Sequence, residues 1–426
     1  MRTQGPRATP TPLTSLVSLA LSSCGLLLLA CGPASPPGEL VSSNKQRVTT
    51  AAPDEDLGAA LSGNHAFAVD IYRKLTSTSS NVVFSPYSIT TALAMTYGGA
   101  QGATAKAFES TLHITLPPER FHRAMNTIDA ALTSRGGAGR SLKLSVENQL
   151  FAQKGFSILP GFLDLMATEY GAGVRLLDFA KASEAARKAI NEWVKANTES
   201  LIPELLQPSD VDSDTVLFLV NTVYFNAAWA TAFPHKSTRP APFELTDGSQ
   251  VEVPTMAAED ISGGRATVDG TEVIELPYKG EQMSMVLLVP PSGQLSQFEA
   301  RLSADELARH FGALAPATFA LLMPKFAFSG RADMKQLLTE LGLGVAFGDT
   351  AEFGALSPEP IAISRVVHQA IIRTNEDGTV AAAATGVGME RVSLPLYVTV
   401  NRPFLFFVRD RGTGAVVFMG RVVDPR

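Results

Sequence analysis

Helical patterns fill most of the first half of this 426-residue chain, and strand patterns dominate its second half. In the first half, apolar residues such as Phe67, Ile71 and Leu75 recur every four positions, which places them on one helical face. The second half contains runs of β-branched and aromatic residues bounded by turn formers. This segregation predicts an α+β fold rather than a sheet built from alternating strand–helix units.

Ser85 and Pro86 mark the start of one predicted helix, which ends near Gly98. Serine can cap free backbone N–H groups, and proline suits the first helical position because its missing N–H is not needed there. Further helices are predicted over 118–134, 159–170, 182–198, 304–314 and 332–341. Strands are predicted over 215–225, 271–278, 283–289, 318–325, 397–409 and 415–423.

Composition limits the class of protein. Hydrophobic residues make up 45% of the chain and include 23 Phe, which is enough for a large core. The net charge of −6, without a cluster of Lys and Arg, argues against a nucleic-acid partner. Cys24 and Cys31 are the only cysteines, so we expect no disulfide framework, thiolate metal site or cysteine nucleophile in the main domain.

The N-terminus has the features of a secretory signal. Arg2 and Arg7 precede an apolar stretch over 13–30 that is too short and too Ser-rich to span a membrane comfortably. The run Leu-Leu-Ala-Cys at 28–31 resembles the lipobox of bacterial lipoproteins, in which the cysteine is lipidated and becomes the mature N-terminus. The alternative is an ordinary signal peptide in which Cys31 is incidental.

We therefore expect a lipoprotein signal peptide over 1–30, a lipidated Cys31 with a flexible tether over 31–56, and one globular domain over 57–426. The protein would be secreted and anchored by lipid to a bacterial membrane, at the cell surface or in the periplasm.

Catalytic motifs are missing from the sequence. No two histidines have the H-x₃-H or HExxH spacing of a zinc site, and no G-x-S-x-G, Walker or G-x-G-x-x-G motif follows a predicted strand. We therefore expect that the protein is not an enzyme, and a hydrolase is the weakest of the functions considered.

One segment, 376–385, resembles neither ordinary core nor ordinary loop. Gly378 precedes four consecutive alanines, Ala381 to Ala384, and Gly386 and Gly388 follow them. By propensity alone the alanines could form a surface helix with glycine flanks.

The chain closely resembles the serpin family over nearly all of 57–426. The resemblance rests on five motifs that occur in the family's order. They are NVVFSPYSI at 81–89, NTVYFNAAW at 221–229 with Phe233, Thr238 and Phe243, MPKF at 323–326, the segment at 376–385, and VNRPF at 400–404. The resemblance implies about eight or nine helices around three β-sheets, with a mobile reactive-centre loop over about 376–400.

In serpins, a serine protease cleaves this loop, and the loop then inserts as a central strand of the main sheet with the protease still attached. The resemblance assigns the insertion hinge to Glu376, Gly378, Thr379, Ala381, Ala382, Ala383, Ala384 and Thr385. With the two-residue alternation of a strand, Thr379, Ala381, Ala383 and Thr385 would face the core, so no charged or bulky group would be buried. This favours an inhibitor over the alternative, a non-inhibitory serpin that acts as a surface binding module.

Family spacing places the cleaved bond at Val392–Ser393, because Val392 follows Gly378 by 14 residues and precedes Asn401 by nine. A small branched residue before the cut suits elastase-like and some subtilisin-like proteases. A cut shifted to Arg391 would instead favour trypsin-like proteases.

The resemblance also assigns residues that control opening of the sheet. Ser85, Ser88, Asn221 and His368 would form a polar cluster, the shutter, beneath the opening. Glu376 and Lys325 would form an ion pair near Trp229 at the top of the sheet, in the region called the breach. We expect a monomer with no cofactor and no metal, whose partners are a serine protease and, through the lipid, a membrane.

Overall fold

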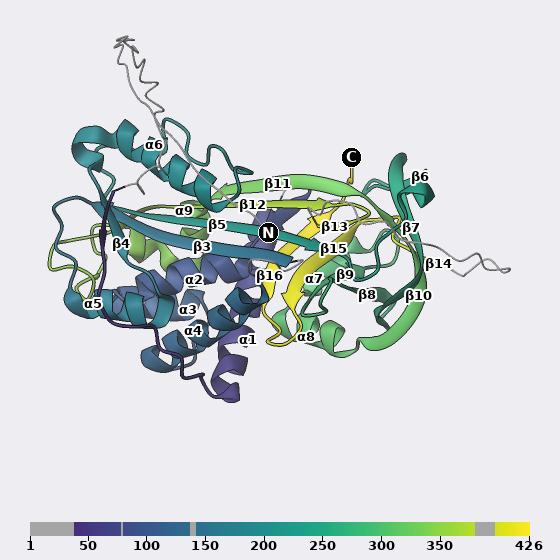
Figure 1. The fold of residues 1–426 in the computed structure, drawn as a ribbon, viewed down its shortest axis with the longest axis horizontal. Helices are drawn as coiled ribbons and strands as arrows, with labels where there is room; N and C mark the ends of the chain where they lie inside the picture. The colour runs from purple at the N-terminus through teal and green to yellow at the C-terminus, as the bar shows by residue number, and fades with distance from the viewer. Residues whose placement is uncertain (1–37, 78–79, 137–141, 380–396) are drawn as a thin grey trace, which may run out of the picture. The chain divides into compact units, whose positions relative to one another are not determined.

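The structure is a computed structural model that describes residues 38–77, 80–136, 142–379 and 397–426. Figure 1 labels its helices and strands. Its α-helices are α1 Asp54–Leu75, α2 Pro86–Tyr97, α3 Gly102–Thr111, α4 Pro118–Arg135, α5 Pro160–Leu165, α6 Phe179–Asn197, α7 Leu295–Arg301, α8 Ala304–Gly312 and α9 Met334–Leu338. Its strands are β1 Glu39–Val41, β2 Val82–Phe84, β3 Leu142–Gln153, β4 Val174–Leu177, β5 Leu217–Ala228, β6 Arg239–Glu244, β7 Gln250–Val268, β8 Thr271–Pro277, β9 Met283–Val289, β10 Ala315–Pro324, β11 Phe326–Asp333, β12 Ile363–Thr374, β13 Gly378–Thr379, β14 Tyr397–Thr399, β15 Phe404–Asp410 and β16 Val416–Val422.

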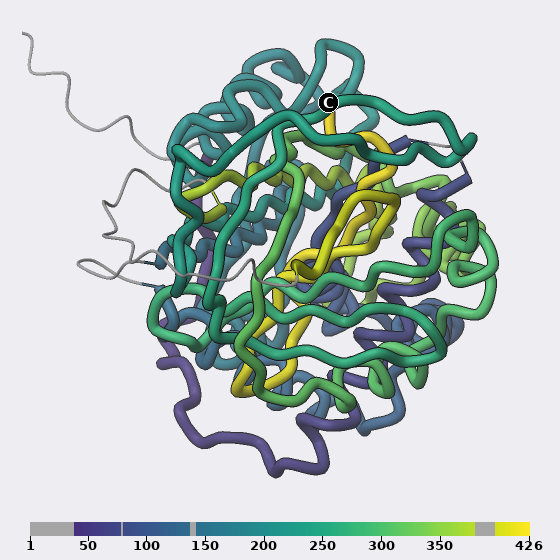
Figure 2. Tube along the Cα trace, turned by 90° about the vertical axis from the view of Figure 1, so that its right-hand side faces the viewer, coloured from purple at the N-terminus to yellow at the C-terminus, as the bar shows by residue number. Residues whose placement is uncertain are grey.

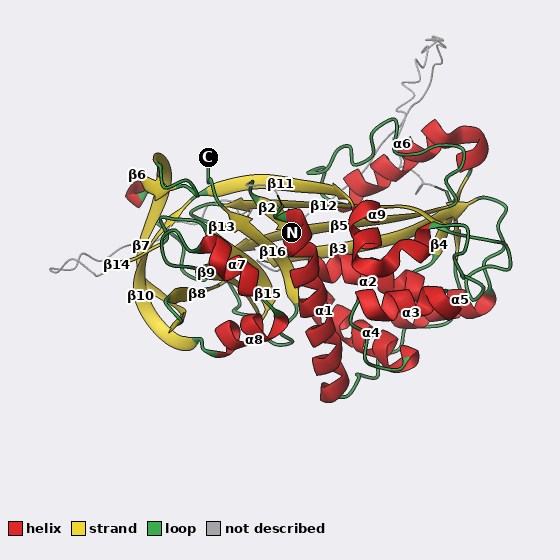
Figure 3. Ribbon diagram, turned by 180° about the vertical axis from the view of Figure 1, so that it is seen from behind, coloured by secondary structure: helices red, strands yellow, loops and turns green. Residues whose placement is uncertain are grey.

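Among the described residues, seven strands form one large sheet in the order β1-β4-β3-β5-β13-β12-β11. Strands β5 and β12 also pair directly and in parallel, from Leu217 opposite Ile363 to Val223 opposite Ala370. Helix α6 covers one face of this sheet, where Trp193 packs against Phe151. Most of the other helices gather on the opposite face, as Figure 3 shows.

Nine strands form the second sheet, in the order β14-β10-β7-β8-β9-β15-β16-β2, with β6 paired to β7. The expected three sheets appear here as two, because the 19-residue β7 pairs with β6 and β10 and also with β8. Segments from opposite ends of the sequence meet in it. In Figure 2, β16 near the C-terminus runs beside β2, with which it pairs.

Helix α2 lies between the two sheets, in contact with β3, β5 and β16. Its start follows the sequence prediction, because the Ser88 backbone N–H donates to Ser85 Oγ at 3.3 Å and Pro86 is the first helical residue. Every residue of α2 is buried. The shutter serines are therefore held rigidly under the large sheet.

Most predicted elements are present, but some boundaries were wrong. The predicted helix 159–170 is the six-residue α5 followed by a π-helical turn, Met166–Tyr170. The predicted strand 397–409 is two strands, β14 and β15, because Pro403 cannot donate a backbone hydrogen bond between them. The long strands β3, β7 and β12 were not predicted.

The predicted boundary at residue 57 was also wrong, because the fold includes residues from 38 onward. Strand β1 pairs with β4, so it is the edge strand of the large sheet. The Arg47 guanidinium donates to Asn126 Oδ1 and to Asp129 Oδ2, each at 2.7 Å. Asp56, at the N-terminal end of α1, is buried and accepts from Arg120 Nε at 3.0 Å. Residues 38–56 are thus part of the domain and not of a tether.

Candidate functional site: the hinge and the opening of the large sheet

A tight hairpin at one end of the large sheet connects β12 to β13. The Asn375 backbone N–H donates to the Gly378 carbonyl at 2.9 Å, and Asn375 Oδ1 accepts from the backbone N–H groups of Asp377 and Gly378. The hairpin returns the chain between β5 and β12, where Thr379 pairs with Ala227 on one side and with Thr374 on the other. The sheet is therefore already separated at this end by a two-residue strand.

Only glycine fits at position 378. Its φ is +153°, and a Cβ there would lie 2.1 Å from the Ala227 carbonyl oxygen and 2.7 Å from Ala228 Cα. Both contacts are with backbone, which cannot rotate away. Gly378 therefore allows the chain to turn into the sheet at close range.

The structure places Glu376 and Lys325 together. Lys325 Nζ lies 2.9 Å from Glu376 Oε2, and the Thr238 hydroxyl donates to Glu376 Oε1 at 2.7 Å. Burial by itself raises the pKa of Glu376, but the hydrogen bonds from Lys325 and Thr238 outweigh it and hold that pKa below its ordinary value. The carboxylate is charged at neutral pH and fixes the start of the hinge to the base of β11.

Trp229 holds the backbone of the hairpin. Its indole N–H donates to the Asn375 carbonyl, and its backbone N–H donates to the Asp377 carbonyl, each at 2.9 Å. The ring stacks on Tyr278 with centroids 4.7 Å apart and an interplanar angle of 7°. The Tyr278 hydroxyl lies 2.8 Å from Thr379 Oγ1. The aromatic pair therefore contacts both the turn and the inserted strand.

A buried polar cluster lies farther along the sheet, where β5 and β12 are adjacent. The Ser85 backbone N–H donates to His368 Nε2 at 3.0 Å, so Nδ1 carries the proton and donates to Asn221 Oδ1 at 2.6 Å. The Asn221 amide in turn donates to Ser88 Oγ and to Asn148 Oδ1. The four predicted shutter residues are thus brought together, with Asn148 as a fifth member.

His368 is neutral in this cluster. It is 1% exposed, and burial lowers its pKa to about 3. Its hydrogen bond to Asn221 joins β12 to β5 directly, because these two residues are register partners in the parallel pairing. A strand inserted between β5 and β12 must break that bond.

Sequence reasoning missed several residues of the site. Asn148 is on the unpredicted strand β3, opposite Asn221. Tyr278 was the last residue of a predicted strand, and nothing in the sequence indicated its contact with Thr379. His235 was noted only as a histidine, yet its Nε2 lies 3.1 Å from Asp377 Oδ1 in the hairpin.

The other predicted site residues lie outside the described residues. They are Cys31, Ala381, Ala382, Ala383, Ala384, Thr385, Arg391, Val392 and Ser393. Within the described ranges, no helix has the length and apolar character needed to cross a membrane. No group of three or more potential ligands there could hold a metal ion.

Comparison with known proteins agrees with this geometry. The family model described as "Serpin (serine protease inhibitor)" matches residues 62–425. The leukocyte elastase inhibitor of Sus scrofa is 36% identical over 387 residues, which cover 87% of this chain and all of the relative. The solved structure of a thermophilic serpin, tengpin, in the native state has a TM-score of 0.80 at 25% identity and covers 90% of this chain and 97% of its own. Uncleaved ovalbumin has a TM-score of 0.79 at 27% identity and covers 86% of this chain and all of its own. From its sequence motifs, its fold and these relatives, the chain belongs to the serpin family.

Proposed function

We propose that this serpin inhibits serine proteases as a suicide substrate, by inserting its cleaved loop into the large sheet. The observation that carries the proposal is the position of β13, which already lies between β5 and β12. Insertion of the cleaved loop would start from this opening.

The register of β13 defines where further insertion would go. Thr379 pairs with Ala227 on β5 and with Thr374 on β12, both antiparallel. Counting on from these pairs, position 385 falls opposite Asn221 (227 + 379 − 221) and equally opposite His368 (374 + 379 − 368). An inserted Thr385 would thus separate the two residues whose hydrogen bond now joins β5 to β12, and its hydroxyl would stand within the polar cluster.

The same register supports the proposed side-chain alternation. Thr379 is 1% exposed and contacts Tyr278 on the core side of the sheet. Positions 381, 383 and 385 would follow it onto that side, because alternate residues of a strand share a face. Ala381, Ala383 and Thr385 are small enough to enter without strain.

Complete insertion would move an attached protease by about the length of the sheet. At the far end of the sheet, Ile363 on β12 would fall opposite position 390 (374 + 379 − 363) and its partner Leu217 on β5 opposite position 389 (227 + 379 − 217), because the register shifts between Ile363 and Arg365. The new strand would therefore end near position 390 and measure about 40 Å at ~3.4 Å per residue. Val392 would then lie just beyond the far end of the sheet, still joined through its carbonyl carbon to the protease serine. The pull on this acyl bond would distort the oxyanion hole, and loss of one donor there slows such chemistry by about 10²–10³.

Elastase-like proteases are the proposed targets. The relatives named leukocyte elastase inhibitor are proteins of the same family, and Val392 is a small branched residue that suits such a pocket. Subtilisin-like enzymes with a similar pocket form part of the same proposal, and cleavage after Arg391 would instead indicate a trypsin-like target.

The test is incubation with an elastase-like protease, followed by denaturing electrophoresis and mass analysis of the released fragment. We expect an SDS-resistant complex and a peptide that begins at Ser393, and we expect the loop-cleaved protein to resist heat far better than the intact one. The Thr379→Arg variant forces a charge into the sheet, which is costly, so it should be cleaved without trapping the protease. Thr379→Val is the matched control, since it keeps the shape and should still form the complex. Clean cleavage of the unaltered protein by a broad panel of proteases, with no complex, would favour the binding-module function.

We also propose that the mature protein is lipidated at Cys31 and exported to a bacterial membrane. The lipobox-like sequence at 28–31 supports this proposal. Metabolic labelling with an alkyne fatty acid should mark the expressed protein and its Cys24→Ser variant but not Cys31→Ser. Equal labelling of the two variants would contradict it.

A further inference from the structure

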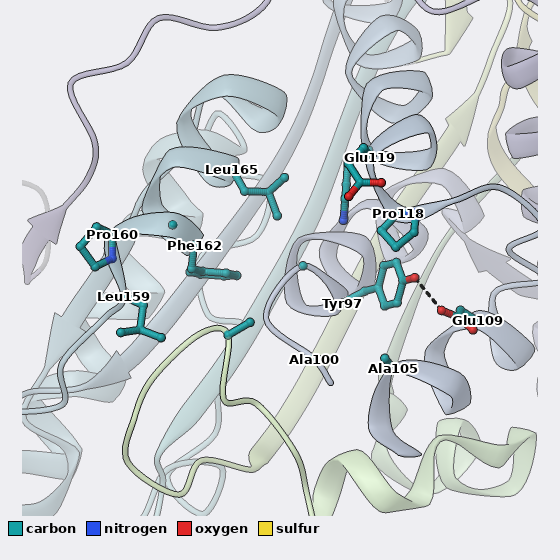
Figure 4. Close-up of a pocket in the computed structure, with 14 residues that line it drawn as sticks. Tyr97, Ala100, Ala105, Glu109, Pro118, Glu119, Leu159, Pro160, Phe162 and Leu165 are labelled. Atoms are coloured by element: carbon teal, nitrogen blue, oxygen red, sulfur yellow. Dashed lines mark hydrogen bonds between the residues drawn. The ribbon is translucent and has the colours of Figure 1, made fainter. Parts of the chain in front are cut away.

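A hollow of about 600 Å³ lies away from the hinge and the polar cluster, where α2 ends and α3, α4 and α5 approach one another (Figure 4). It shares no residue with the site described above. Its size lies within the range of protein sites for small molecules, about 300–1,000 Å³. Nothing in the proposed inhibitory mechanism uses it.

The walls of this hollow are mainly apolar. Leu159, Phe162 and Leu165, at and before α5, form one side, and the ring of Tyr97 faces them from the other side in Figure 4. Tyr97 is 4% exposed and packs against the rings of Phe108 and Phe121, with centroids 6.0 and 6.1 Å away. The aromatic wall is therefore held in place before any ligand arrives.

The charge of the hollow is negative. Glu109 and Glu119 are the acidic side chains that line it, and no Lys or Arg occurs among the described residues of its wall. Burial lowers the pKa of His122 to about 4, so that imidazole is neutral. Burial and the hydrogen bond to Glu109 raise the pKa of Tyr97, so its hydroxyl also stays neutral. Tyr97 donates to Glu109 Oε1 at 2.9 Å, which places the carboxylate beside the aromatic ring.

His122 adds an available polar group. It lines the hollow, is 3% exposed, and its Nδ1 lies 2.6 Å from the Tyr170 hydroxyl. Within the described ranges, this contact is the one hydrogen bond of the imidazole, and Nε2 has no protein partner. An imidazole nitrogen without a protein partner on the wall of a cavity can form a hydrogen bond with a ligand or water.

We propose that this hollow binds an amphipathic organic ammonium ion, with its apolar body between Phe162 and Leu165 and its cationic head beside Tyr97 and the two carboxylates. Aromatic faces attract organic cations, and two carboxylates on a wall that contains no Lys or Arg strengthen that preference. An anionic amphiphile would meet repulsion at the same place, and a neutral one would gain only the apolar contacts.

The test compares three ligands of the same shape by calorimetry on the full chain. They are 4-phenylbutylammonium, 4-phenylbutanol and 4-phenylbutyrate. We expect the ammonium ion to bind about tenfold more tightly than the alcohol, from one cation–π contact and one partly exposed ion pair, and the carboxylate to show no binding.

Variants distinguish this site from a non-specific crevice. The double variant Glu109→Gln and Glu119→Gln keeps the shape and should reduce ammonium binding to the level of the alcohol, with alcohol binding unchanged. Glu192→Gln, which removes an exposed carboxylate from α6, is the charge-matched control and should change neither affinity. Ala105→Phe, which occupies the hollow, should abolish binding of both ligands. Equal affinity for the ammonium ion and the alcohol, or no binding of the ammonium ion, would overturn the proposal.

Discussion

Replacement of Asn221 by alanine should be among the most destabilising single changes in the large sheet. Asn221 is 0% exposed, accepts a hydrogen bond from His368 Nδ1 and donates hydrogen bonds to Ser88 and Asn148. Truncation leaves two buried partners, His368 and Ser88, and the half-buried Asn148 without their hydrogen bonds to this side chain. Each buried group left unpaired costs about 1–3 kcal/mol. Because the Ser88 hydroxyl can rotate and the site can partly relax, we expect a loss of about 3–5 kcal/mol in the free energy of unfolding.

Thr222→Val is the matched control for this experiment. Thr222 is the next residue on β5 and is equally buried, but its hydroxyl has no hydrogen-bond partner among the described residues. The substitution keeps the shape and removes an unsatisfied group, so we expect a change within about 0.5 kcal/mol. Urea titration followed by circular dichroism and by fluorescence of the two tryptophans measures both variants.

The same two variants can also be compared after cleavage of the loop. After insertion, β5 and β12 would stand about 9.5 Å apart, two strand spacings, and the hydrogen bond between His368 and Asn221 could not exist. Asn221→Ala should therefore destabilise the intact protein more than the cleaved one. If Asn221→Ala and Thr222→Val shifted the transition of the intact protein equally, the assigned role of the cluster would be refuted.

Three further predictions concern the hinge, the acid response and the N-terminal segment. Gly378→Ala places a methyl group against the Ala227 carbonyl, so β13 should leave the sheet and the fluorescence of Trp229 should change. Gly348→Ala is the control, because a methyl group at that position meets no other atom, and it should leave the fluorescence unchanged. Burial lowers the pKa of His368 to about 3 and that of His122 to about 4 in the native protein. In the unfolded chain these histidines have a pKa of about 6.5, so below that pH the unfolded chain binds protons that the native protein does not bind. The free energy of unfolding should therefore fall as the pH drops from about 6.5 to about 4, by about 1.4 kcal/mol per pH unit for each histidine. In unfolding titrations, His368→Gln should show a smaller decrease per pH unit. An unchanged decrease would contradict the assignment of a neutral His368. Arg47→Ala should lower the free energy of unfolding by about 1–2 kcal/mol, because it removes hydrogen bonds to Asn126 and Asp129. Lys45→Ala breaks only an exposed ion pair with Asp164 and should lower it by less than about 0.5 kcal/mol. Equal losses in thermal or urea unfolding would show that Arg47 does not hold the N-terminal segment.

The sequence determined the features that depend on neighbouring residues or on short motifs. Ser85 and Pro86 predicted the start of α2, because the cap and the first helical position are set within one turn. The period of the apolar residues predicted much of α1, α4 and α6, and the position of the hinge glycine followed from the family resemblance. The fold class could also be read from the order of helical and strand patterns.

Only the tertiary structure decided how distant segments meet. Strand β7 contains Gly263 and Gly264, which oppose strand formation locally, but pairing with β8 and β10 on either side overrides that preference. Asn148 joins the polar cluster only because β3 lies beside β5, and Tyr278 reaches Thr379 only because the second sheet ends next to the opening of the first. The sequence predicted a tether over residues 38–56 because they are rich in small and polar residues. In the structure, pairing of β1 with β4 provides hydrogen-bond partners for the backbone N–H and C=O groups of this strand, which have none among their sequence neighbours. Local sequence fixes caps, turns and periodicity, whereas hydrogen bonds and contacts between strands far apart in the chain depend on the whole fold.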